Sequence, residues 1–253
     1  MMRCLRGCGL LLATALMLPG EAGASSLLLL EDDWESGSIA SADWISWGSP
    51  VPVLESGGNA AGNYSLDPNG DGYYLSGLVS ASAFSLSGGV RVSIDAYIES
   101  ALQWSELSFG LARTTEITQN NVHLEHLATV TIDADLQGTG YQFYWKFAGD
   151  GGVESDGSST PEAVFDAWHN YVFDFAADGS ARLRVDGAVV FESSPGLYDY
   201  GIDEEFAVLL GGRSYGATVN LYDSIRATQV PEPTTALLFT LGLAGLGMRR
   251  RVR

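Results

Sequence analysis

Apolar and polar residues alternate along much of the chain between residues 25 and 229. From Val90 to Glu99 every second residue is apolar, which is typical of a strand with one buried and one exposed face. Similar alternation recurs at 107–111, 141–147 and 168–175. Turn-forming pairs punctuate these runs, namely Gly88-Gly89, Asp178-Gly179 and Asp186-Gly187. No run of helical spacing lies between the two ends of the chain, so the pattern predicts a single all-β domain over residues 25–229.

The N-terminal residues 1–24 have the composition of a signal peptide. Arg3 and Arg6 precede an apolar run from Gly9 to Leu18, and Ala22-Gly23-Ala24 supplies small residues for cleavage after Ala24. Both cysteines, Cys4 and Cys8, lie before that point. The mature chain therefore contains no cysteine, which excludes disulfides, thiolate catalysis and zinc sites built on cysteine.

The C-terminal residues 230–253 follow a different pattern from the domain. The prolines of Pro231-Glu232-Pro233 oppose regular helix and central strand, which predicts an extended linker. An uncharged apolar segment from Ala236 to Met248 follows, and we expect it to form a transmembrane helix by recruiting flanking residues. A basic stop closes the chain and would stay on the cytoplasmic side: Arg249, Arg250, Arg251 and Arg253. These properties alone also fit an ordinary membrane anchor that is never cleaved.

The order of proline motif, apolar segment and arginines resembles the PEP-CTERM sorting tail of exported bacterial proteins. The resemblance implies recognition by a membrane-embedded exosortase after export through signal peptidase. It further implies a Gram-negative origin, anchoring in the inner membrane through the C-terminal helix, and delivery to the cell surface or the medium after processing. The sorting residues it implies are Pro231, Glu232 and Pro233.

The charge of residues 25–229 is strongly acidic, with seven basic and 29 acidic residues. Nucleic acids and anionic lipid surfaces both require a basic footprint, so neither is an expected partner of the domain. Its aromatic and β-branched content is too high for a disordered acidic tract.

The segment from Trp168 to Phe191 narrows the choice among all-β folds. A strand from Trp168, a turn at Asp178-Gly179, a strand at 181–185 and a turn at Asp186-Gly187 follow one another. This order resembles the concanavalin A-like or laminin-G-like jelly roll, as do the segments 27–37 and 209–226. The resemblance implies a two-sheet antiparallel sandwich whose first and last strands lie together. Its motifs concern packing and turns, so they support fold better than function.

Three carboxylates near the mature N-terminus, Glu31, Asp33 and Glu35, match the Glu-x-Asp-x-Glu signature of laminarinase-type β-glucanases, which share this fold. On a strand they would share one face, as the carboxylates of a retaining glycosidase do. Those enzymes carry the signature in mid-domain, however, and a hydrophobic residue stands where this chain has Asp32. We therefore assign no catalytic residue, and the chain is expected not to be an enzyme.

Calcium is the alternative for these acidic residues. In related carbohydrate-binding jelly rolls, carboxylates from the first and last strands share a structural calcium ion. By position, Asp33 and Glu35 would join Asp223 in such a site, and Asp223 could equally accept backbone hydrogen bonds. The stretch from Asp67 to Gly72 matches the first half of an EF-hand loop but lacks its final glutamate, which favours a turn.

Aromatic side chains outside the predicted core are the remaining candidates for a binding surface. Flat rings with polar tips suit sugars and protein partners. The ligand-facing set that we predict is Trp44, Trp47, Gln142 and Tyr144.

The two resemblances together predict an exported, non-enzymatic protein of the cell surface or matrix that binds glycans associated with exopolysaccharide. A glycoside hydrolase acting on a matrix polysaccharide is the alternative from another class. A purely structural matrix component that binds cations loosely is the third.

Overall fold

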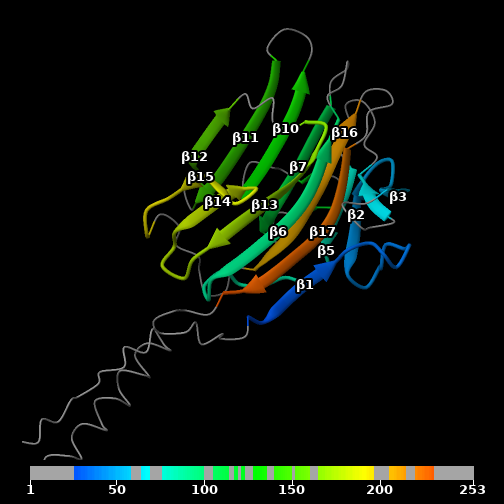
Figure 1. The fold of residues 1–253 in the computed structure, drawn as a ribbon. Coiled ribbons are helices and arrows are strands. Elements are labelled where there is room, and N and C mark those ends of the chain that lie inside the picture. The colour runs from blue at the N-terminus through cyan, green and yellow to red at the C-terminus, as the bar shows by residue number, and fades with distance from the viewer. Residues whose placement is uncertain are drawn as a thin grey trace, which may run out of the picture.

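The fold is a sandwich of two antiparallel β-sheets stacked face to face (Figure 1). The computed structural model describes residues 26–57, 64–68, 76–99, 105–113, 117–118, 121–122, 128–135, 140–149, 152–159, 165–196, 205–214 and 220–230. Every regular element in these ranges is a strand, which confirms the all-β prediction. Stacking buries one face of each sheet, because alternate side chains point to opposite faces.

The first sheet has the strand order β15-β14-β13-β6-β17-β4-β3, and β1 also pairs with β17. Its strands are β1 (Leu28–Asp32), β3 (Val53–Ser56), β4 (Tyr64–Asp67), β6 (Val90–Ile98), β13 (Trp168–Phe175), β14 (Ala181–Val185), β15 (Ala188–Glu192) and β17 (Asn220–Gln229). The central strand β6 lies between β13 and β17, which are far from it in sequence. The sheet therefore depends on long-range pairing.

The second sheet has the order β12-β11-β10-β7-β16-β5-β2. Its strands are β2 (Trp44–Gly48), β5 (Ser76–Ser80), β7 (Ser105–Arg113), β10 (Ala128–Asp135), β11 (Gly140–Gly149), β12 (Gly152–Ser159) and β16 (Phe206–Ser214). A separate pair joins β8 (Ile117–Thr118) to β9 (Asn121–Val122).

The core lies between the two sheets. Alternate residues of β6 and β13 are buried on one side, and those of β7 and β16 meet them from the other. Phe109 makes edge-to-face contacts with Tyr171, Phe173 and Tyr222, at centroid distances of 4.8, 6.3 and 5.7 Å. Such contacts stabilise aromatic pairs beyond the area that they bury.

Tyr222 also ties the sheets together through a hydrogen-bond network. Its hydroxyl lies 2.9 Å from the carbonyl oxygen of Ser108 and 2.7 Å from that of Gly211, both in the opposite sheet. The Gly211 N–H lies 3.3 Å from the same hydroxyl and donates to it. Because the hydroxyl is buried, losing these partners would leave polar groups unsatisfied.

The two ends of the domain lie side by side. β1 pairs antiparallel with β17, and the N–H of Gln229 donates to the carbonyl of Leu27 at 2.8 Å. The expected meeting of first and last strands is thus confirmed. The predicted signal peptide and the residues after Val230 lie outside the described ranges, and so does the predicted Asp67–Gly72 turn from residue 69 onward. Across the ranges that are described, no helix is long and apolar enough to cross a membrane.

Candidate functional site

The carboxylates of Glu31, Asp33 and Glu35 do not share a strand face. β1 ends at Asp32, and Trp34 then turns the chain with a φ of 57°. Glu31 faces Arg226 at 3.7 Å, whereas the Asp33 carboxylate accepts the Glu35 N–H at 3.1 Å within the turn. The expectation of an alternating strand across this signature is therefore wrong, because the strand stops before its second carboxylate.

The predicted calcium ligands Asp33, Glu35 and Asp223 do not form one group. Glu35 accepts the N–H of Tyr64 at 3.2 Å, and Asp223 is buried, with its carbonyl accepting the indole N–H of Trp34 at 2.7 Å. Within the described ranges no three histidine, cysteine or acidic side chains are grouped to hold a metal ion. Calcium binding stays a prediction, with no ligand set behind it.

Two of the four predicted ligand-facing residues are buried. Trp44 is 3% exposed, packs against Trp34 in the core and donates its indole N–H to Asp32 at 2.7 Å. Trp47 is 8% exposed and covers Gly211, where an added Cβ would lie 2.6 Å from the indole ring. Their placement on a ligand-facing surface is wrong, because Trp44 packs in the main core and Trp47 packs in a second buried cluster over Gly211.

Gln142 and Tyr144 occupy alternate positions on β11. Gln142 is opposite Asp133, and Tyr144 is opposite Thr131 on one side and Ser158 on the other. The row of Tyr144 continues through Ser108, Gly211 and Gly77 to Trp47, five strand spacings away, or about 24 Å. The sheet register therefore does not bring the four predicted residues together.

A row of opposite charges crosses the outer face of the first sheet. Arg91 on β6 is opposite Asp174 on β13, Asp174 is opposite Arg182 on β14, and Arg182 is opposite Glu192 on β15. Directly opposed residues are close enough for their side chains to interact. The alternating pattern predicted these side chains to face outward, but only the sheet order places them in one row.

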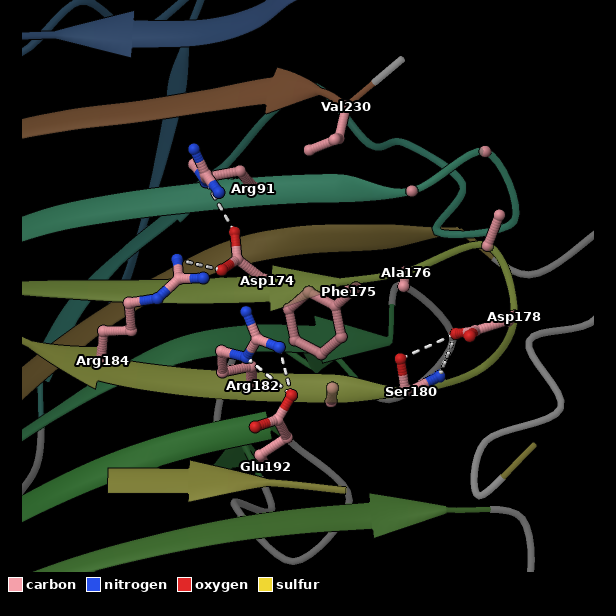
Figure 2. A pocket seen from close by; sticks show the side chains of 14 residues that line it. Arg91, Asp174, Phe175, Ala176, Asp178, Ser180, Arg182, Arg184, Glu192 and Val230 are labelled. Carbon is pink, nitrogen blue, oxygen red and sulfur yellow. Dashed lines mark hydrogen bonds and ion pairs between the residues drawn. The ribbon is translucent and has the colours of Figure 1, made fainter. Parts of the chain in front are cut away.

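These side chains form the floor of a pocket of about 530 Å³, called here the arginine pocket (Figure 2). Its lining residues are Gly88, Gly89, Arg91, Asp174, Phe175, Ala176, Ala177, Asp178, Ser180, Ala181, Arg182, Arg184, Glu192 and Val230.

Asp174 is shared between two guanidinium groups in this pocket. One oxygen lies 2.5 Å from Nε of Arg91, and the other pairs with Nη1 of Arg184. Arg182 donates from Nε and Nη2 to a single oxygen of Glu192. The Asp174 side chain is 17% exposed, whereas those of Arg91 and Arg182 are 48% and 38% exposed. The arginines thus reach solvent over a largely covered carboxylate.

Turns build the wall of the pocket. The Asp178 carboxylate accepts both the N–H and the hydroxyl of Ser180, at 3.0 and 2.7 Å, and these bonds lower the pKa of Asp178. Gly89, with a φ of 76°, forms the turn before β6, and its carbonyl accepts the N–H of Val230 at 2.9 Å. Hydrogen-bonded turns give the pocket a fixed rim, immediately before the proline motif.

Sequence reasoning did not select the arginine pocket. A usable signal was nevertheless present, because three of the seven basic residues between positions 25 and 229 line it. Two of them, Arg182 and Arg184, alternate on one short strand. The clustering of these scarce basic residues on one sheet face was the sequence pattern that could have indicated the pocket.

A comparison with protein-family models finds a match at the C-terminal end of the chain. Residues 229–251 match the model of the PEP-CTERM protein-sorting motif. The chain carries a PEP-CTERM sorting motif. Such a motif implies export, a membrane-anchored sorting step and processing by an exosortase, as predicted from Pro231, Glu232 and Pro233. A search of curated proteins finds no relative.

Solved structures match the domain at low identity. The carbohydrate recognition domain of Emp47p is 10% identical with a TM-score of 0.56, over 83% of this chain and 99% of that one. A glycoside hydrolase family 16 endo-glucanase from Bacteroides ovatus is 10% identical with a TM-score of 0.53, over 79% and 99%. A galectin-like protein of unknown function from Bacillus subtilis is 11% identical with a TM-score of 0.52, over 80% and 96%. These likenesses establish the concanavalin A-like jelly-roll fold.

Proposed function

We propose that this PEP-CTERM protein is a non-enzymatic glycan-binding protein of the cell surface or extracellular matrix, and that it binds through the arginine pocket. Export and sorting follow from the tail, and the fold is one that carbohydrate-recognition domains use. Association with exopolysaccharide, passage through the inner membrane of a Gram-negative cell and final release by the exosortase belong to this proposal.

The polar lining of the arginine pocket is the observation that supports glycan binding. Planar guanidinium groups of Arg91, Arg182 and Arg184 offer donors in fixed directions, and Glu192 keeps a second carboxylate oxygen as acceptor. Sugars carry closely spaced hydroxyls that need both kinds of partner. The volume also lies within the roughly 300–1,000 Å³ range of ligand pockets.

The same contacts support a binding role over catalysis at this place. Both oxygens of Asp174 are bonded to guanidinium groups, and Glu192 is held by Arg182. A glycosidase needs one carboxyl group that carries a proton and a second that is free to attack or to activate water. Carboxylates held by arginines are poorly suited to those tasks.

A glycan-array screen of the protein, purified with its tail in mild detergent, tests the proposal. We expect binding to a defined set of polysaccharides and about tenfold weaker binding after Arg91→Gln with Arg184→Gln, the loss expected when charge-assisted hydrogen bonds are removed. Arg226→Gln is the matched control, because Arg226 lies on the same sheet outside the pocket. A protein that binds no glycan would contradict the proposal. Repeating the screen with calcium and with a chelator tests the calcium prediction.

A glycoside hydrolase remains the second candidate because of one register observation. Glu106 on β7 is opposite Asp133 on β10, and Arg213 on β16 is opposite Glu106. Directly opposed positions are neighbours across the sheet, and a retaining glycosidase needs two carboxyl groups close together. Release of new reducing ends from β-glucans, abolished by Glu106→Gln and by Asp133→Asn, would decide for hydrolysis.

A further inference from the structure

The arginine pocket has more hydrogen-bond donors to spare than acceptors. Arg91 contacts Asp174 through Nε alone, and within the described residues its two Nη groups have no partner. Arg184 engages Asp174 through Nη1 alone among the residues that the structure describes, which leaves its Nε and Nη2. Among the carboxylates of the lining, both oxygens of Asp174 are used, whereas Glu192 and Asp178 each keep one oxygen without a described partner. The best complement is a ligand group that only accepts hydrogen bonds.

The charge at the floor of the pocket is also locally positive. Arg91 and Arg184 share the single carboxylate of Asp174, so one positive charge is left over around Asp174, while Arg182 and Glu192 balance each other. The remaining carboxylate of the lining, Asp178, lies in the wall and is held by Ser180. Elsewhere in residues 25–229 acidic residues far outnumber basic ones. An anion would therefore find a favourable contact beside Arg91 at the floor of the arginine pocket.

The acidic character of the whole domain does not prevent such a contact. Exposed charges farther than a Debye length, about 8 Å at physiological ionic strength, are largely screened. A guanidinium in direct contact with a carboxylate or sulfate forms paired charge-assisted hydrogen bonds, which are roughly twice as strong as neutral ones. The near contact therefore outweighs the distant repulsion.

We propose that the arginine pocket selects polysaccharides that carry an oxyanion, a uronate carboxylate or a sugar sulfate, with the anion lying on the free Nη groups of Arg91 above Asp174. This inference rests on the proposed glycan binding and adds the chemical class of the ligand. Figure 2 shows Arg91 and Arg184 converging on Asp174 from the two strands that flank β13, so the three groups form one anion platform.

The experiment compares matched charged and neutral polymers with the full chain in mild detergent. The pairs are alginate with carboxyl-reduced alginate, and dextran sulfate with dextran, measured by biolayer interferometry at low and high salt. Arg91→Gln removes the platform, and Arg226→Gln removes an arginine of similar exposure, 57% against 48%, on the same face. Exposed ion pairs contribute little to stability, so both variants are expected to fold, and a melting curve checks this.

We expect a charged polymer to bind at least about tenfold more tightly than its neutral partner, in line with charge-assisted hydrogen bonding, and to weaken with salt. Arg91→Gln should remove most of that preference, and Arg226→Gln should keep it. Preference for alginate identifies carboxylate as the anion, and preference for dextran sulfate identifies sulfate. Equal binding of charged and neutral polymers overturns the inference but leaves glycan binding intact. Equal losses in the two variants also overturn it, and binding to no polymer at all overturns both proposals.

Discussion

Asp186 connects the β14–β15 turn to the adjacent strand β13 through one carboxylate. Asp186 lies in the turn with a φ of 49°. Its carboxylate accepts the His169 Nδ1–H at 2.6 Å and the Asn170 N–H at 2.9 Å. Its backbone N–H donates to the Asn170 carbonyl. Partial burial raises the pKa of Asp186, but the two hydrogen bonds and the His169 charge outweigh this, so the pKa is lowered overall. The carboxylate therefore stabilises the fold in its ionised form.

Replacing Asp186 by Asn should destabilise the secreted region 25–229 by about 1 kcal/mol at neutral pH, the net worth of a typical hydrogen bond. Because the folded pKa lies below the unfolded value of about 3.9, the contribution is present above that value and is lost as pH falls through the folded pKa. Urea unfolding across acid pH should show the difference between wild type and variant shrinking below about pH 4. A difference that stays constant down to the lowest pH would contradict this assignment.

Two glycines, Gly77 on β5 and Gly211 on β16, lie where the structure leaves no room for a side chain. An added Cβ at Gly77 would lie 1.8 Å from the Leu210 carbonyl oxygen, and one at Gly211 would lie 2.6 Å from the Trp47 ring. Trp47, Val79 and Leu209 form a second buried cluster on the face of this sheet opposite the main core. The two glycines thus set the spacing of β2, β5 and β16.

Gly211→Ala should destabilise the domain by about 1–3 kcal/mol, the usual cost of overpacking a filled site. If the contact with Trp47 causes this loss, the double variant Gly211→Ala with Trp47→Leu should lose less stability than the two single variants lose in sum. The reason is that changes in the free energy of unfolding are not additive for residues in contact. Urea unfolding of the four proteins measures this cycle. Strictly additive losses of stability would show that the Trp47 contact is not the cause of the destabilisation.

Alternation predicted the strands that have one exposed face. The expected boundaries of β13 and β14 match the structure residue for residue, because each strand has a buried face and a polar face. β5 is buried along its whole length and β2 is short, so neither alternates, and for that reason Trp44 and Trp47 were placed outside the predicted core. The scarce arginines marked the arginine pocket only in part, because Arg91 and Asp174, 83 residues apart, meet only through strand order.

At the scale of the whole molecule, the two ends of the domain meet on neighbouring strands. β1 follows the predicted signal peptide, β17 precedes the sorting motif, and the two strands pair directly. Val230, the residue before the proline motif, is tied to Gly89 and lines the arginine pocket. A ligand in the pocket would therefore lie beside the residue that immediately precedes the proline motif.

Glu232 is the one charged residue of the proline motif, so the sorting prediction can be tested there. Glu232→Ala should leave the full-length protein in the inner membrane, because the change removes the acidic group between two prolines while keeping the apolar segment and the arginines that anchor it. Thr235→Ala is the matched control, since it alters the same linker without changing charge. Cell fractionation with immunoblotting reports both location and size. If the Glu232 variant still reached the surface with its tail removed, the sorting prediction made from this motif would be wrong.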